Sequence, residues 1–390
     1  MVFVKFRANR VFWVFVIQIF ITPFAWSSPS DEVVQAQAVI DKLIHQTGIP
    51  GLSITVMVGP TETWSQGFGL ADLENDIQVT PDTLMRVGSL SKSMTATALV
   101  KAGEQGTVDL DADIREYLPS FPQKKHVITL RQLGGHLGGV RHYKTDSEKY
   151  VFQHFDTVLS SLNLFQNDPL ISVPGSEYHY SSYGYNLLSA VAEAAFEREF
   201  PEFLAYYLWQ PLVMKHTVQD DVNLVIPGRA RQYVKDNNGA LINAPYTDNS
   251  YKFAGGGMLS TSRDLAKFGH ALVNDSFLNS ASRELLFSSQ VTTDGRSTGY
   301  GLGWFVDMTK FLEDRKDRIP PELYGHLIDL FQDRQLIWHS GTSSGAVAML
   351  LLVPETQVTV AITANLGGVG RQLIAATMEI EAIFSTAQQR

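Results

Sequence analysis

The chain of 390 residues contains no cysteine. This absence excludes thiol nucleophiles, disulfide frameworks, iron–sulfur clusters and cysteine-based zinc sites, so any covalent catalysis would have to use oxygen or nitrogen. The sequence also lacks internal repeats, low-complexity tracts and runs of basic residues, and its formal net charge is −9. Without a basic face to contact phosphates, nucleic acid is not an expected partner. What is present is an ordinary globular composition, 44% hydrophobic and 18% charged, in a chain long enough for roughly two to three domain-sized units.

The N-terminal segment has the pattern of a secretory signal. Three basic residues precede an apolar run at residues 11–22, and Ala25 and Ser27 supply small side chains at the −3 and −1 positions of a possible cleavage site. An uncleaved anchor is less favoured, because Pro23 interrupts a stretch already shorter than the roughly 20 residues of a spanning helix. The sequence predicts a signal peptide over residues 1–28 and export to the periplasm or extracellular space. Removing its three cations changes the charge from −9 to −12 and leaves no stable membrane span.

The two ends of the mature chain carry matching patterns of helix and strand. At the N-terminus, apolar residues at helical spacing follow Ser30, which can cap the helix, and stop at Gly48. Alternating residues then predict a hairpin, and the C-terminus repeats the arrangement in reverse order. The predicted strands cover residues 52–58, 63–69, 346–353 and 357–363, and the predicted C-terminal helix covers about 371–383.

Helices at both ends can cover one antiparallel sheet that is assembled from both ends of the chain. The predicted fold class is therefore α/β, in the α+β sense, with a sheet domain formed by residues 29–107 and 289–390. The intervening residues 108–288 contain stretches of helical periodicity such as 185–195 and 264–272. They are predicted to form an inserted, mostly helical domain.

With thiols absent, a nucleophile would be a hydroxyl with a base at a fixed offset. Ser89 and Lys92 form a Ser-x-x-Lys motif at the start of a predicted helix. At positions i and i+3 the side chains share a helix face, so the amine can reach the hydroxyl, and the helix N-terminus supplies N–H donors for an oxyanion. A lysine becomes a useful base only when its pKa falls from about 10.4. Alone the motif is weak, because a serine at this place is usually only a cap.

A second candidate group lies before another predicted helix. Tyr180 and Ser182 point to one side if their segment is extended, so a phenol and a hydroxyl could face a shared site. The alternative is a capped helix with aromatic packing, and the neighbouring tyrosines are predicted to pack: Tyr178, Tyr183 and Tyr185.

A third group, His339-Ser340-Gly341-Thr342, precedes the predicted strand at 346–353. On the edge of a sheet, the backbone N–H of Thr342 and the hydroxyl of Ser340 could meet a substrate.

Taken in this order, the three motifs resemble those of the serine β-lactamase and penicillin-binding-protein-like superfamily, above all its class C-related, peptidase S12-like branch. The resemblance extends over about residues 31–385. Residues 139–143 and 180–185 are especially similar to the mitochondrial serine β-lactamase-like members, which are of the protease type. Other stretches that look like family landmarks are 106–111, 117–119, 128–133, 255–261 and 299–304.

The resemblance implies a β-lactamase/transpeptidase-like fold and a role for each motif residue. Ser89 would be the acylated nucleophile and Lys92 its activating base. Tyr180 would share the proton transfer, taking a proton from the attacking group and later passing one to the leaving group. The backbone N–H groups of Ser89 and Thr342 would form an oxyanion hole, in which each donor contributes about 3–4 kcal/mol of transition-state stabilisation.

The sequence also departs from the family pattern. His339 stands in place of the usual lysine of the third motif and is mostly neutral near pH 7, so a permanent cation for a substrate carboxylate is missing. Ser182 stands where β-lactamases commonly carry asparagine. Residues 134–139 hold extra glycines, which are expected to loosen a loop near the cleft. Efficient β-lactam turnover is accordingly the less expected activity.

Two other motifs compete with this interpretation. Ser343 lies in a literal Gly-x-Ser-x-Gly sequence, but a strand follows it and His339 is the last histidine, which argues against a nucleophile elbow. Asp109, Asp111 and Asp113 imitate the opening of a calcium loop without its glycine and glutamate, so capping and a solvated turn are favoured. No metal or other cofactor is expected.

The expected function is that of a secreted serine hydrolase that forms an acyl-enzyme on a small-molecule or peptide substrate and cleaves peptide, amide or ester bonds. A β-lactamase or a D,D-carboxypeptidase-like penicillin-binding protein is the first alternative. A catalytically silent binding or assembly protein on the same fold is the second. The identity of the substrate and the oligomeric state stay open.

Overall fold

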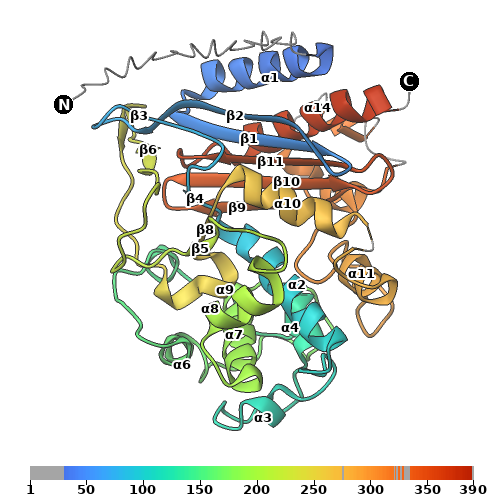
Figure 1. The fold of residues 1–390 in the computed structure, drawn as a ribbon. Helices are drawn as coiled ribbons and strands as arrows, with labels where there is room; N and C mark the ends of the chain where they lie inside the picture. The colour runs from blue at the N-terminus through green and yellow to red at the C-terminus, as the bar shows by residue number, and fades with distance from the viewer. Residues whose placement is uncertain are drawn as a thin grey trace, which may run out of the picture.

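The computed structural model describes residues 30–388 except 275, 320, 322–323, 326 and 329–333. The predicted signal peptide at residues 1–28 lies outside the described residues. The described part forms layers, with a central sheet between two terminal helices on one side and a larger helical region on the other (Figure 1). None of the helices described has both the length and the apolar character needed to cross a membrane.

In the part of the chain that the structure describes, six antiparallel strands form the main sheet, in the order β3-β2-β1-β11-β10-β9. The first and last hairpins of the chain meet at its centre, where β1 pairs with β11 and Leu52 lies opposite Ala364. This pairing confirms the predicted antiparallel sheet assembled from both chain ends. The strands are β1 (Gly51–Val58), β2 (Thr61–Asp72), β3 (Ile77–Gln78), β9 (Ile337–Ser343), β10 (Ala346–Val353) and β11 (Val358–Ala364).

The terminal helices α1 (Asp31–Thr47) and α14 (Gly370–Gln388) cover one face of the sheet and pack against each other (Figure 1). As predicted, α1 ends at Gly48, whose left-handed φ of 67° suits glycine. Ser30 takes the N-cap position, but its side chain makes no capping hydrogen bond, so the predicted capping contact is wrong. Acidic residues in the first turn of α1 instead offset the positive end of the helix dipole.

The opposite face of the sheet is covered by α10 (Ser262–Leu272), which packs on β1, β10 and β11. The buried Ser262 hydroxyl is hydrogen-bonded to the hydroxyls of Ser53 (2.7 Å) and Thr55 (2.9 Å) on β1. α10 falls inside the predicted insertion 108–288, yet it lies on the sheet, and one apolar core continues from this face into the helical region. The division of the chain into the two predicted domains stays a prediction.

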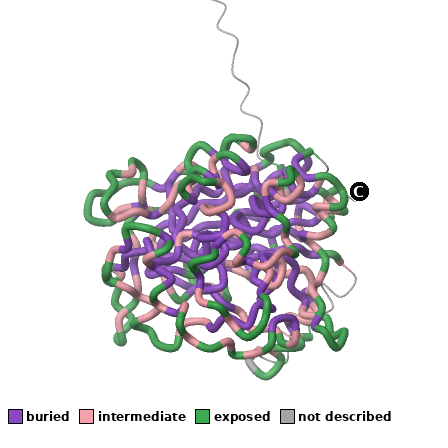
Figure 2. Tube along the Cα trace, turned by 90° about the horizontal axis from the view of Figure 1, so that it is seen from below, coloured by how far each residue is buried: buried purple, intermediate pink, exposed green. Residues whose placement is uncertain are grey.

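Two long helices form the middle of the helical region, α2 (Ser91–Glu104) and α7 (Ser182–Phe196), and both are mostly buried. Figure 2 shows buried residues throughout the interior and exposed residues on the peripheral loops. The other described elements are the helices α3 (Ile114–Tyr117), α4 (Leu130–Gly134), α5 (Asp146–Lys149), α6 (Val158–Ser161), α8 (Phe200–Leu204), α9 (Phe253–Gly256), α11 (Ser280–Phe287) and α12 (Met308–Glu313), the short turns η1 (Gly88–Leu90), η2 (Leu162–Leu164), η3 (Ala205–Trp209), η4 (Ser250–Lys252) and η5 (Lys316–Arg318), and the strands β4 (Met85–Arg86), β5 (Val218–Gln219), β6 (Tyr233–Lys235), β7 (Leu241–Asn243) and β8 (Met258–Ser260).

The contact between α10 and the sheet depends on Gly269. A Cβ atom at this position would lie 2.4 Å from the side chain of Leu352 and 2.7 Å from that of Thr359. We expect Gly269→Ala to lower the free energy of unfolding by about 1–3 kcal/mol, because overpacking outweighs the better helix propensity of alanine. Thermal and urea denaturation would measure the change.

Gly103→Ala is the matched control, since Gly103 also lies in a helix but its added Cβ would make only ordinary contacts of 3.4 Å or more. This variant should be neutral or more stable by up to about 1 kcal/mol. Equal effects of the two substitutions would contradict the close packing of α10 on the sheet.

Candidate active site

Ser89 lies in the turn η1, between the short strand β4 and the helix α2. This turn touches the edge strand β9 so closely that neither side can carry a side chain at the contact. A Cβ on Gly88, whose φ is 51°, would lie 2.6 Å from the backbone nitrogen of Thr342, and a Cβ on Gly341 would lie 1.8 Å from the carbonyl oxygen of Val87. Glycine at both positions therefore lets the serine turn pack directly on the sheet edge.

Lys92 lies one helical turn after Ser89, and its amine points at the serine. The Lys92 Nζ atom lies 3.2 Å from Ser89 Oγ and 3.0 Å from Ser182 Oγ, and it also contacts the carbonyl of Gly255. Burial, followed by the positive charge of Lys252, lowers the pKa of Lys92 well below its usual value. A neutral amine can donate two hydrogen bonds and still accept the proton of the Ser89 hydroxyl.

Tyr180 lies beside the same amine, with its ring centroid 4.9 Å from Lys92 Nζ. Burial raises the pKa of the Tyr180 phenol, and a hydrogen bond with Ser89 opposes part of that rise. The phenol is therefore protonated at neutral pH, whereas the lysine is the group whose pKa is lowered. The structure thus brings Ser89, Lys92, Tyr180 and Ser182 together, and it makes the amine the better base and the phenol the better proton donor.

Two histidines hold the segment that carries Tyr180 and Ser182. The carbonyl of His136 accepts the N–H of His179 (2.9 Å), and the Nδ1 atom of His136 accepts the N–H of Ser181 (3.1 Å). The His136 ring also lies against Tyr180, with ring centroids 4.3 Å apart. His136 has a left-handed φ of 61°, which is uncommon for a residue with a side chain.

His142 supports the next residue of this segment, because its Nδ1 atom accepts the N–H of Ser182 (3.1 Å). Burial and the charge of Lys92 lower the pKa of His142 to about 4, so the ring is neutral and keeps this acceptor at neutral pH. Sequence reasoning assigned neither of these histidines a part in the site. The glycine-rich departure at residues 134–139, which includes His136, was the available signal.

The expectation that the extra glycines loosen residues 134–139 is wrong. Gly134 accepts a hydrogen bond from the Tyr185 hydroxyl (2.8 Å). A Cβ on Gly139 would lie 2.4 Å from the carbonyl oxygen of Ser172, and a Cβ on Gly138 would lie 2.7 Å from the Leu133 side chain. The glycines therefore allow tight packing of the loop.

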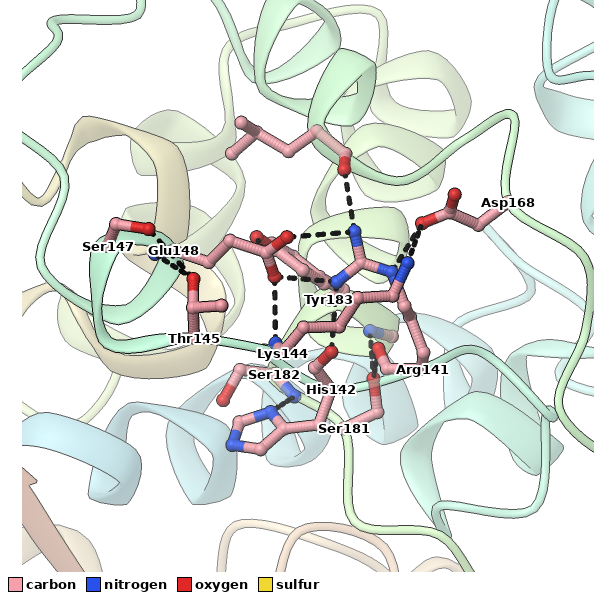
Figure 3. Close-up of polar contacts among 12 residues, drawn as sticks. Arg141, His142, Lys144, Thr145, Ser147, Glu148, Asp168, Ser181, Ser182 and Tyr183 are labelled. Carbon is pink, nitrogen blue, oxygen red and sulfur yellow. Dashed lines mark hydrogen bonds and ion pairs between the residues drawn. The ribbon is translucent and has the colours of Figure 1, made fainter.

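Arg141 fixes the remainder of this loop (Figure 3). Its guanidinium pairs with Glu148 (2.7 Å) and Asp168, and its carbonyl accepts the Ser181 hydroxyl (2.8 Å). Ser181 Oγ also accepts the N–H of Gly184 and so caps α7. The cap, the two histidines and the arginine thus position the segment from several directions.

His339 is buried and does not act as a cation. Burial and the charge of Lys92 lower its pKa to about 3, in agreement with the expectation that it is neutral near pH 7. Its Nδ1 lies 2.6 Å from the carbonyl oxygen of Ser340, so Nδ1–H is the donor there and Nε2 accepts the Tyr300 hydroxyl (3.0 Å). Both ring nitrogens are therefore engaged within the protein.

The backbone of β9 supplies the edge predicted to hold a substrate. Trp338 exchanges both backbone hydrogen bonds with Phe305, on the side away from β10. By strand alternation the N–H groups of Ser340 and Thr342 point the same way, and Thr342 lies beside the Ser89 turn. The N–H of Ser89 lies in the first turn of η1, where a helix leaves its donors unpaired. The Ser340 side chain is half-buried at this edge, and its contact with a substrate stays a prediction.

The competing motifs have other roles in the structure. Ser343 ends β9 and leads through a tight turn into β10, so no helix follows it. Asp113 caps α3 and Asp111 pairs with Arg131 (2.6 Å), as the capping interpretation predicts. Among the described residues, no cluster of three or more acidic or histidine side chains could hold a metal ion.

Comparison with known proteins supports the predicted family. A family model described as Beta-lactamase matches residues 36–382. The human protein described as serine beta-lactamase-like protein LACTB, mitochondrial, is 30% identical over an alignment 402 positions long, gaps included. The alignment covers 81% of this chain and 71% of that protein.

Solved structures share the fold. The D-amino acid amidase from Ochrobactrum anthropi SV3 has a TM-score of 0.76 at 22% identity, covering 92% of this chain and 99% of that chain. EstCE1, a hydrolase with promiscuous acyltransferase activity, has a TM-score of 0.71 at 18% identity, covering 91% and 98%. The predicted β-lactamase/transpeptidase-like fold is confirmed.

The lowered pKa of Lys92 leads to a test of its function as base. We expect Lys92→Ala to slow the phosphonylation of Ser89 by a fluorophosphonate at least about 100-fold, since general bases contribute at least that much to the rate. Intact-protein mass spectrometry would follow labelling, and circular dichroism would check folding. Lys101→Ala is the control, because Lys101 lies on the same helix and pairs with Glu104. Wild-type labelling of the Lys92 variant would contradict the assignment.

The electrostatics of the site also predict its pH dependence. The labelling rate should rise with pH as Lys92 loses its proton, and because its pKa is lowered the rise should be complete well below pH 10.5. His339→Gln should leave the midpoint unchanged, since His339 has already lost its proton above pH 3 or so. Rate measurements between pH 5 and about 10 would test both statements. A midpoint that moves in the His339 variant would show that the histidine titrates in the working range.

Proposed function

The chain belongs to the beta-lactamase family, and on this basis we propose that it is a serine hydrolase that cleaves peptide, amide or ester bonds through an acyl-enzyme on Ser89. One observation carries the proposal: the buried Lys92 amine, with its lowered pKa, lies within hydrogen-bond distance of the Ser89 hydroxyl. A lysine that only stabilised the fold would be expected to have a carboxylate partner when fully buried. Lys92 instead contacts two hydroxyls and a carbonyl.

The proposed reaction proceeds in two steps. In the first, Ser89 Oγ attacks the substrate carbonyl while its proton passes to Lys92, and the N–H groups of Ser89 and Thr342 stabilise the oxyanion. The bond to the leaving group then breaks, and Tyr180 delivers a proton to the departing nitrogen or oxygen and is reprotonated from Lys92. In the second step, water attacks the ester on Ser89 with the same base, which releases a carboxylic acid and restores the serine.

The neutral His339 is the reason to place β-lactams among the poorer substrates. The lysine it replaces would hold a positive charge next to the reaction centre, and a carboxylate beside the scissile bond would pair with it. His339 donates its Nδ1–H within the strand and accepts from Tyr300, so it offers a substrate no charge. The proposal therefore favours acyl compounds that lack a carboxylate at this position.

Two probes would test the proposed function. A fluorophosphonate should label wild-type protein at Ser89, a labelled penicillin should react more slowly, and Ser89→Ala should abolish both reactions. Labelling by neither probe would favour a catalytically silent protein and would overturn the proposal. Fast penicillin turnover would favour the β-lactamase alternative. Digestion of an unbiased peptide library, with Ser89→Ala as the control, would then identify cleavable peptide bonds.

A further inference from the structure

The orientation of β9 determines the direction in which a bound acyl group must extend. The His339 end of the strand contacts Tyr300, whose ring lies 6.5 Å from that of Tyr180. Because a strand rises about 3.3 Å per residue, Ser343 lies roughly 13 Å further along, on the other side of Thr342. With the carbonyl oxygen at the Thr342 N–H, the leaving group faces the Tyr180 phenol. The acyl group must then extend toward Ser343 and Gly345.

A cavity of about 740 Å³ opens in that direction, and Thr342 itself lines it. It lies at the end of the sheet marked by β6, where the β9–β10 turn meets the segment between β11 and α14 (Figure 1). Tyr150, Phe152 and Pro245, from the helical region, line it as well. The cavity is within the range of about 300–1,000 Å³ typical of ligand sites, whereas roughly 150 Å³ already holds benzene. An acetyl group would leave most of it empty.

Glycines shape the inner end of this cavity. Gly345 has a left-handed φ of 70°, and a Cβ on it would lie 2.5 Å from Ala244 and 2.6 Å from Gln232. Gly367 and Gly368 line the cavity as well. Short turns without side chains therefore surround the space at the end of the sheet.

The walls of the cavity are mainly apolar. Tyr150, Phe152, Val234, Pro245 and Val369 contribute apolar or aromatic surface. Phe152 is 67% exposed and stacks on Tyr246, itself 56% exposed, with ring centroids 6.3 Å apart. This exposed aromatic pair extends the apolar lining outward.

The described lining residues include one charged side chain, Lys235. Its Nζ atom lies 3.5 Å from the position of a Cβ on Gly48, at the C-terminal end of α1. A helix C-terminus favours a positive charge, so this end of α1 stabilises the charge of Lys235. The other described lining residues carry no charge, so most of the cavity suits an uncharged acyl chain.

We propose that this cavity is the acyl-binding site and that it selects substrates with a large apolar acyl group, such as medium-chain or aryl-substituted esters and amides. The inference rests on the proposed function, because it requires a carbonyl held between Ser89 and Thr342. The acyl group enters the cavity before attack and leaves it as the carboxylic acid after hydrolysis. Binding energy gained along the chain raises kcat/KM with each methylene that is buried.

A series of p-nitrophenyl esters from acetate to octanoate, with fluorophosphonate labelling of Ser89 in parallel, would test the inference. In the wild-type protein, kcat/KM should rise about threefold to fourfold for each added methylene until the cavity is full. Val234→Trp, which narrows the cavity, should lower the octanoate-to-acetate ratio of kcat/KM at least tenfold. Gln372→Trp narrows the cavity from α14 and serves if the first variant does not fold.

Val225→Trp is the matched control, because Val225 is 96% exposed and lies outside the cavity. It should keep the wild-type ratio. A flat chain-length profile in wild-type protein that still labels at Ser89 would overturn the acyl-site inference and leave the proposed hydrolase function intact. An unchanged ratio in the folded narrowing variants would overturn it as well. If the wild-type protein showed neither labelling at Ser89 nor turnover of any ester, the proposed function itself would fail.

Discussion

The contact between the turn η1 and the edge strand β9 is the constraint on which the site depends. Gly88 lies on one side of this contact and Gly341 on the other. A Cβ atom at either position would clash with backbone atoms of the other element. The contact joins the helical region to the sheet and brings the Thr342 N–H beside Ser89. Because backbone positions are more rigid than side chains, the proposed oxyanion donors, held in this way, would need little reorganisation during the reaction. The packing of the fold and the geometry of the proposed site therefore both require glycine at these two positions.

The second feature on which the site depends is the burial of the Lys92 amine without a counter-ion in the described part of the chain. Lys92 is enclosed by hydroxyls, a carbonyl and aromatic rings, and no carboxylate pairs with it in the described part of the chain. Such surroundings penalise charge, so they lower the pKa of the amine and raise that of the Tyr180 phenol. One environment therefore prepares a base and an acid side by side. It also keeps His339 and His142 neutral, which preserves their hydrogen-bonding roles.

Local sequence patterns predicted the parts of this structure that depend on local geometry. The i and i+3 spacing placed the Lys92 amine at the Ser89 hydroxyl, and alternation predicted the hairpins that build the sheet. The position of α10 on the sheet depends on Ser53 and Ser262, which are far apart in sequence and carry no shared pattern. The same holds for His136, whose acceptor atom meets Ser181 only after folding. Residue spacing cannot encode such contacts, and it gave no indication of the cavity beside Thr342.

The pairing of β1 with β11 has a consequence for how the molecule is made. These neighbours at the centre of the sheet come from opposite ends of the chain, with Leu52 beside Ala364. During synthesis the N-terminal hairpin must wait for almost the whole polypeptide before its partner strand exists, and closing so long a loop is slow. The edge strand β9, which carries the proposed oxyanion donor of Thr342, is also among the last segments to emerge. A nascent or truncated chain would therefore have the proposed nucleophile, Ser89, without the backbone donor of Thr342, and the proposed activity would arise only in the finished fold.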